Sequence, residues 1–128
     1  MVRLMTFRTN RKDVDAATAN HVLTHAMSTM RVPLEAERVN IDAGFFSAFA
    51  SFQISEAEFT ALTEKRSWRM KPLARNDEWE LYNFRILFQD FPPSIEDGLY
   101  YSNATHRGGY DVLYDRGAQR AWMIYTRN

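Results

Sequence analysis

Cysteine is absent from this chain of 128 residues, so it has no disulfide framework, no thiolate nucleophile and no cysteine-ligated zinc. Net charge is absent as well, because sixteen basic residues balance sixteen acidic ones. Without an overall field, the chain is not drawn to nucleic acid or to an acidic membrane, and any recognition must be local. The lack of cysteine fits a reducing compartment, and we expect the protein to be cytoplasmic.

The chain also has no long apolar run. Its first residues, MVRLMTFRTNRKD, are too interrupted for the core of a signal peptide, and no stretch approaches the length of a membrane span. We therefore expect a soluble protein with no membrane association. Glycine and proline are scarce, and no repeat or low-complexity segment is present, so we expect a single domain over residues 1–128.

Common catalytic motifs are missing too. The sequence contains no GxSxG elbow, no P-loop, no GxGxxG and no HExxH. These absences disfavour the common hydrolase, nucleotide-binding and zinc-protease classes, while unusual catalytic arrangements stay open. We therefore expect no cofactor and favour a protein that is not an enzyme.

The spacing of apolar residues predicts two helices. One covers about residues 12–30, with Asn10 as its cap, because six apolar positions form a single stripe at helical spacing. The second covers about residues 56–65, because Ser55 followed by Glu58 forms a capping box. The stripe of the first helix consists of Ala16, Ala19, Leu23, Ala26, Met27 and Met30.

Aromatic residues are abundant, at 14% of the chain, which suits the half-buried faces of a sheet. The segment 79–90 is ambiguous: its apolar residues scatter around a helical wheel but share one face of a strand, so we predict a strand. The fold class is therefore α+β, an antiparallel sheet of about four to six strands with both helices packed on one face. The other strands are expected near 4–7, 39–41, 46–54, 99–102, 109–114 and 120–126.

The last two strands form a C-terminal β-hairpin, because the turn-rich DRGAQ joins them. Both faces of this hairpin are apolar, so its second face is covered either by another element of the chain or by a partner. Aromatic residues are enriched at interfaces. We therefore predict an interface, for another protein or for a homodimer, formed by Tyr110, Tyr114, Trp122 and Tyr125.

Strand propensity and tight turns explain most residues of the stretch YYSNATHRGGYDVLYD, but they do not explain His106 and Arg107. They are candidate ligand-binding residues in an alternative function, a small-ligand-binding or enzymatic domain with a pocket beside them. In that alternative His106 is a general acid or base or contacts an anion, and Arg107 holds a carboxylate or phosphate.

Two further patterns give weaker hypotheses. In HVLTH, His21 and His25 have the spacing of two zinc ligands on one helix face, but no third ligand is evident, so we predict no metal site. The stretch 65–75 surrounds Trp68 with five basic residues, which gives nucleic-acid binding as a minor alternative. The acidic residues that follow would screen it, so nucleic acid is not the expected partner.

The interpretation favoured by these observations is a small non-catalytic protein. It acts by binding another protein or by self-association, and it resembles accessory or immunity-type factors only as a class. A small-molecule ligand belongs to the alternative function.

Overall fold

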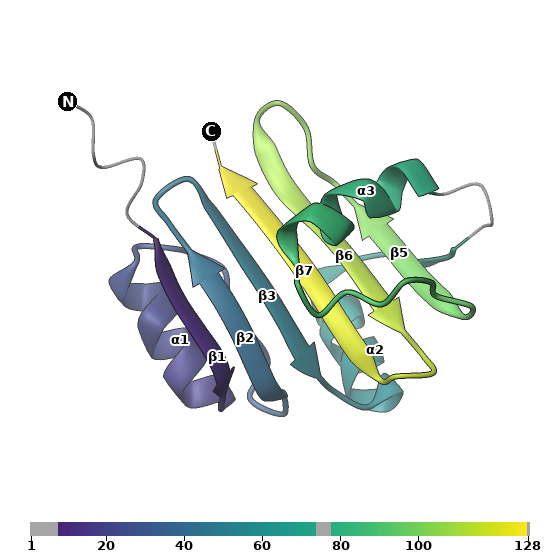
Figure 1. Cartoon of the computed structure of the whole chain (residues 1–128), viewed down its shortest axis with the longest axis horizontal. Coiled ribbons are helices and arrows are strands. Elements are labelled where there is room, and N and C mark those ends of the chain that lie inside the picture. Colours follow the sequence, from purple (N-terminus) through teal and green to yellow (C-terminus); the bar gives the residue numbers. More distant parts are fainter. Residues whose placement is uncertain (1–7, 74–77, 128) are drawn as a thin grey trace.

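A seven-stranded antiparallel sheet forms the centre of the computed structural model, which describes residues 8–73 and 78–127 (Figure 1). The strand order is β1-β2-β3-β7-β6-β5-β4. The strands are β1 (Thr9–Val14), β2 (Glu37–Ala43), β3 (Ser47–Gln53), β4 (Lys71–Pro72), β5 (Gly98–Ser102), β6 (Gly108–Asp115) and β7 (Arg120–Arg127). The helices are α1 (Ala16–His25), α2 (Glu56–Arg66) and α3 (Glu78–Leu87).

The α+β class and the antiparallel sheet are confirmed, but two details of the expected architecture are wrong. The described residues form seven strands and three helices, rather than four to six strands and two helices. The two predicted helices, which correspond to α1 and α2, do pack on one face, and the additional helix α3 lies on the other. Figure 1 shows α1 and α2 behind the sheet and α3 in front of it.

The strand predicted over 79–90 is wrong, because most of this segment belongs to α3. Leu81, Phe84 and Phe88 are buried, with the spacing of one helix face. Tyr82 and Ile86 are 56% and 61% exposed. These exposed apolar side chains mask the helical period in the sequence.

The first predicted helix begins later and ends earlier than expected. Residues 12–14 belong to β1, and Asp15 rather than Asn10 caps α1, because its carboxylate accepts a hydrogen bond from the Thr18 backbone N–H at 2.7 Å. This bond lowers the pKa of Asp15, aided by a second hydrogen bond from the Thr18 side chain. The helix ends at His25, and Met27, with φ 62°, is 64% exposed rather than buried.

The second helix and most strands are confirmed. α2 covers Glu56–Arg66, and the Ser55 hydroxyl accepts a hydrogen bond from the Glu58 backbone N–H at 3.2 Å, as the capping box predicts. The C-terminal hairpin pairs Val112 with Met123, and Leu113 with Trp122 on its other face. The strand expected at 4–7 lies outside the described residues.

Both edges of the sheet are irregular or short. In β1 the register shifts between Arg11 and Val14, and Asp13 has a φ of 55° while its backbone N–H donates to the Asn40 side chain at 2.9 Å. At the other edge, β4 has two residues, one of which is Pro72. Neither edge therefore presents a long regular ladder of free backbone groups.

Two hydrophobic cores lie on the two faces of the sheet. The larger one packs α1 and α2 against β2, β3, β6 and β7, and includes Leu23, Phe52, Phe59 and Tyr114. The smaller one packs α3 against β6 and β7, and includes Phe84, Phe88, Leu113 and Trp122. Figure 1 shows α3 over β5, β6 and β7, whereas β1 and β2 have no helix on that face. Among the described residues, half of this face therefore has no helix over it.

The Tyr114 side chain packs in the larger core and also donates a hydrogen bond to a backbone carbonyl. It is fully buried, its ring stacks on Phe59 at a centroid distance of 4.4 Å, and its hydroxyl donates to the Ile54 carbonyl oxygen at 2.8 Å. Burial raises the pKa of Tyr114 to about 12, and the Glu56 and Asp115 carboxylates add to this shift. Because the folded pKa exceeds the unfolded value of about 10, the stabilisation is complete below pH 10 and is lost as pH rises toward 12.

We predict that Tyr114→Phe is less stable than the parent by about 1 kcal/mol near neutral pH, because one hydrogen bond is lost. As the pH rises from about 10 to 12, the parent should lose on the order of 2 kcal/mol relative to the variant, so the difference disappears and then reverses, because phenylalanine does not titrate. Urea denaturation of both chains between pH 8 and 11.5 measures it. A difference that stays constant over this range would contradict the prediction.

Candidate functional site

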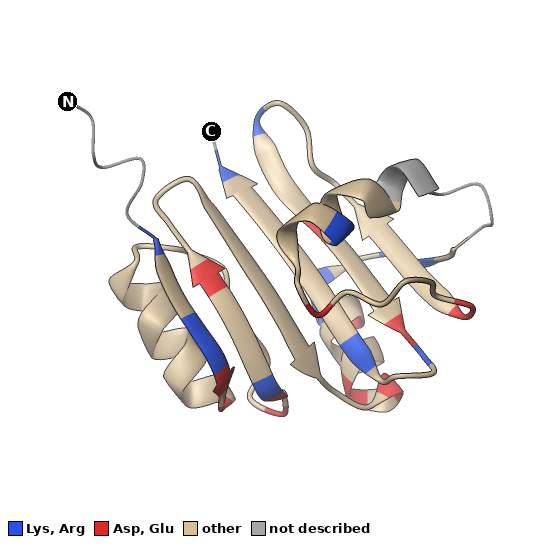
Figure 2. Ribbon diagram, viewed as in Figure 1, with Lys and Arg blue, Asp and Glu red and all other residues tan. Residues whose placement is uncertain are grey.

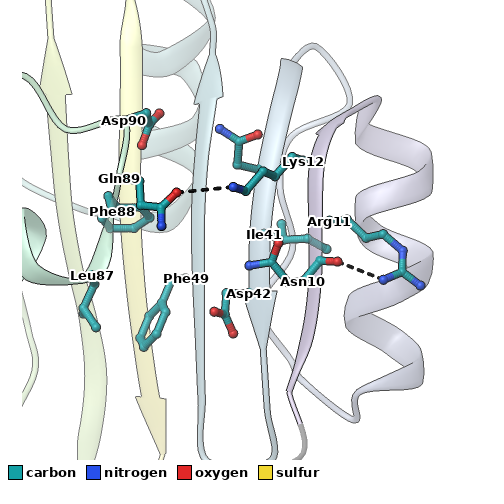
Figure 3. Close-up of a pocket in the computed structure, with 11 residues that line it drawn as sticks. Asn10, Arg11, Lys12, Ile41, Asp42, Phe49, Leu87, Phe88, Gln89 and Asp90 are labelled. Carbon is teal, nitrogen blue, oxygen red and sulfur yellow. Dashed lines mark hydrogen bonds between the residues drawn. The ribbon is translucent and has the colours of Figure 1, made fainter.

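The open half of the sheet forms a cleft with the end of α3, which we call the β1–α3 cleft (Figure 3). Asn10, Asp42 and Phe49 are neighbours across β1, β2 and β3, so their side chains share one face of the sheet. Residues 87–90 form the facing wall. The cleft has a volume of about 390 Å³, and its lining includes Asn10, Lys12, Asn40, Asp42, Phe49, Leu87, Phe88, Gln89 and Asp90.

A hydrogen-bond network beneath the cleft attaches the end of α3 to the sheet. The Asp90 carboxylate accepts hydrogen bonds from Arg120 Nε at 2.8 Å, Ser51 Oγ at 3.0 Å and Trp122 Nε1 at 3.3 Å. Arg120 Nη2 also donates to Ser51 Oγ at 2.9 Å, and Asn40 Nδ2 donates to the same oxygen at 3.3 Å. Every described buried side-chain nitrogen or oxygen has a hydrogen-bond partner.

The geometry of this network suits a role in stability and does not suit catalysis. Ser51 is fully buried, and Arg120 and Asn40 donate to its oxygen, so a substrate cannot reach it as a nucleophile. The Arg120 side chain is only 14% exposed, and its charge is balanced by Asp90. The network therefore holds the cleft wall in place, and the groups that can meet a ligand are those at the cleft surface.

His106 and Arg107 lie in the exposed connection between β5 and β6. This connection turns tightly: Gly109 has a φ of 139°, and a Cβ there would lie 2.6 Å from the Asn103 carbonyl oxygen. Neither residue lines the β1–α3 cleft or the second cleft, which lies between residues 31–35 and α2. The ligand-binding role of His106 and Arg107 stays a prediction.

Of the four predicted interface residues, Tyr114 and Trp122 are buried in the two cores. Tyr110 and Tyr125 are half-buried, with ring centroids 4.8 Å apart, and the Tyr125 hydroxyl accepts a hydrogen bond from Thr29 Oγ1 at 3.0 Å. Both faces of the hairpin are thus covered within the chain, by α2 and by α3. The interface formed by these four residues stays a prediction. Among them, only Tyr110 and Tyr125 have side-chain surface that a partner could contact.

The metal and nucleic-acid candidates also have defined positions. The rings of His21 and His25 lie 4.3 Å apart on the exposed face of α1. The described residues contain no group of three or more His, Asp or Glu that could hold a metal ion. Trp68 is 7% exposed, and its ring lies against Tyr101 and Tyr110. Its ring is therefore not free to stack on a base. Of the stretch 65–75, the last two residues lie outside the described residues.

The sequence prediction missed an exposed aromatic pair in the connection between β2 and β3. Phe45 and Phe46 are 49% and 47% exposed, with ring centroids 4.8 Å apart. The Gly44 backbone N–H donates to the Ser47 carbonyl oxygen at 2.9 Å, which closes the connection. The adjacent phenylalanines after a glycine were the available signal, but alternation placed Phe46 in the strand predicted over 46–54.

Arg127, at the end of β7, contacts both residues of this aromatic pair. Its guanidinium lies over the Phe45 ring at 4.3 Å, and its backbone N–H donates to the Phe46 carbonyl oxygen at 2.9 Å. We call Phe45, Phe46 and Arg127 the aromatic tip. Cation–π contact and the backbone bond both restrict its motion.

The charges left unpaired around the aromatic tip are basic, because the Asp42 carboxylate, two residues before Gly44, is paired with Arg8. Arg127 is paired with Gly108 across the ladder, so the connection that carries His106 and Arg107 lies at the same end of the sheet. In Figure 2 this connection and the end of β7 carry basic but no acidic colour. Among the described residues, neither Arg107 nor Arg127 takes part in an ion pair. The apolar tip thus has a rim of unpaired cations.

We predict that Asp90→Ala lowers the free energy of unfolding by about 2–3 kcal/mol, because Arg120 and the Trp122 indole N–H lose their acceptor in a mostly buried site. Asp97→Ala is the control, since Asp97 pairs with Arg116 at 3.3 Å but its side chain is 65% exposed. This control should leave stability nearly unchanged. Urea denaturation of the three chains tests the contrast, and equal effects of the two substitutions would contradict it.

The helices of the described residues are all too short or too polar to cross a membrane. The chain matches no protein-family model, no curated protein and no solved structure.

Proposed function

We propose that this protein acts by binding another protein through the aromatic tip. The observation that carries the proposal is the exposure of two adjacent phenylalanines, at 49% and 47%, on a connection held by backbone hydrogen bonds. Burying the exposed half of each ring in a partner would contribute roughly 1 kcal/mol per residue. Aromatic residues and arginine are the types enriched where interface energy is concentrated.

The rigidity of the tip supports this role. Gly44 and Ser47 close the connection, and the bond from the Arg127 N–H to the Phe46 carbonyl attaches it to β7. A side chain that is already held in place loses little conformational freedom on binding. Binding at this site therefore requires less ordering than binding at a free loop or terminus.

The basic rim indicates the chemistry of the partner. Arg127, Arg107 and His106 lie at this end of the sheet without a described acidic partner. A partner with an apolar site and acidic residues around it would complement both features. Two tips facing each other would instead bring like charges together. The tip therefore favours a different protein over a second copy of this chain, and it gives His106 and Arg107 a role in recognition.

We predict that the double substitution Phe45→Ser with Phe46→Ser abolishes partner binding without unfolding the protein. The matched control is Leu34→Ser, which also removes an exposed apolar side chain, at 76% exposure. Leu34 lies shortly before β2, whereas the tip follows β2, so the two sites lie at opposite ends of the strand. Candidate partners are the proteins retained by the immobilised parent and by the control, and they are purified whether or not the double variant also retains them.

Calorimetry with each purified candidate gives the decisive measurement. We expect the double variant to bind about tenfold or more weakly, and parent binding to weaken as salt rises from about 50 to about 500 mM. Equal affinity of the double variant and the parent for a purified partner would overturn the proposal. Sedimentation of the parent alone shows whether a second copy is the partner instead.

A further inference from the structure

Lys12 reaches across the β1–α3 cleft. Its side chain starts on the edge strand β1, and its Nζ donates to Oε1 of Gln89, which follows α3, at 3.3 Å (Figure 3). Both residues are exposed, so this contact is accessible to a ligand. A hydrogen bond between an ammonium group and a neutral amide is easily replaced by a charged acceptor.

Among the described charged groups around the cleft, Lys12 has no oppositely charged partner. Asp42 is paired with Arg8, and Asp90 is paired with Arg120 at 2.8 Å. Within the described part of the chain, Lys12 takes part in no ion pair. Arg11 also lines the cleft and takes part in no described ion pair, but its side chain points away from residues 87–90 (Figure 3). Lys12 is therefore the unpaired cation that extends across the cleft, although the whole chain has a net charge of zero.

Apolar side chains lie in the same cleft. Phe49 on β3 and Phe88 after α3 have ring centroids 6.3 Å apart, and Leu87 is 37% exposed. The Asn10 side chain adds an amide on the β1 side. A ligand in this cleft thus meets a cation, an apolar surface and amide hydrogen-bonding groups.

We infer that the β1–α3 cleft binds an organic carboxylate with an apolar group attached. The carboxylate takes the place of Gln89 as the partner of Lys12, and the apolar group lies against Phe49 and Leu87. A monoanion fits better than a phosphate dianion, because Lys12 balances only one negative charge and the Asp42 and Asp90 carboxylates are already paired with arginines. The volume of about 390 Å³ falls in the range of small-molecule sites, about 300–1,000 Å³.

This site is independent of the aromatic tip. The cleft wall is fixed by Asp90, Arg120 and Ser51 before any ligand binds, so the cation and the apolar surface are already positioned. The carboxylate could belong to a free small molecule or to an acidic side chain of a protein. The two sources share this chemistry, and separate probes distinguish them.

The test is a nuclear magnetic resonance titration of the full chain labelled with nitrogen-15. The probes are 3-phenylpropionate, its neutral analogue 3-phenylpropionamide, and the peptide acetyl-Gly-Glu-Phe-Gly-amide. We expect 3-phenylpropionate to shift the backbone amides of β1, β2 and residues 87–90, and the neutral analogue to bind about fivefold more weakly, as for one exposed charge pair. Tighter binding of the peptide at the same amides supports the site and assigns it to protein side chains.

Substitutions test the role of Lys12. Lys12→Gln should weaken 3-phenylpropionate binding about fivefold, whereas Lys71→Gln should leave it unchanged. Lys71 is a matched control, because it is also an exposed lysine on an edge strand, at the opposite edge of the sheet. Urea denaturation checks that both variants are as stable as the parent. Equal binding of the carboxylate and the neutral amide, equal binding by Lys12→Gln and the parent, or no shift at the cleft amides would each overturn the inference.

Discussion

The Asp90 carboxylate attaches the segment after the third helix to the sheet, and much of the molecule depends on that attachment. It accepts hydrogen bonds from the Arg120 guanidinium, the Ser51 hydroxyl and the Trp122 indole, which come from two neighbouring central strands. These bonds join the segment after α3 to β3 and β7, beside the core that α3 covers. The smaller core, the cleft wall and the contact between Lys12 and Gln89 all follow from this attachment.

The unequal covering of the sheet explains why one molecule has two different surface features. α1 and α2 cover one face, whereas α3 covers only half of the other. The uncovered half must remain compatible with water, and its side chains are largely polar around Phe49. The aromatic tip arises differently, because a short connection between two strands cannot fold its side chains back onto either face. The cleft thus results from how the helices cover the sheet, and the aromatic tip results from the short connection between β2 and β3.

The parts of the fold that sequence reasoning predicted are those encoded locally. The C-terminal hairpin followed from alternation around one turn, and α2 followed from Ser55 and Glu58. α3 was missed because Tyr82 and Ile86 are apolar but exposed, so the helical period was hidden. The cleft was not predictable in this way, since Lys12 and Gln89 are 77 positions apart and meet only through the strand order. Local patterns carry no information about such a pairing.

The irregular edges of the sheet restrict how this protein can meet others. Strands at sheet edges recruit further strands when they are long, flat and apolar. Here the bulge at Asp13 and the basic side chains of β1 disfavour such addition at one edge, and the brevity of β4 with Pro72 disfavours it at the other. Growth into fibres by backbone pairing is therefore opposed at both ends of the sheet. Contacts with other molecules are thereby left to side chains, so an exposed apolar side chain at one site does not come with an open strand edge beside it.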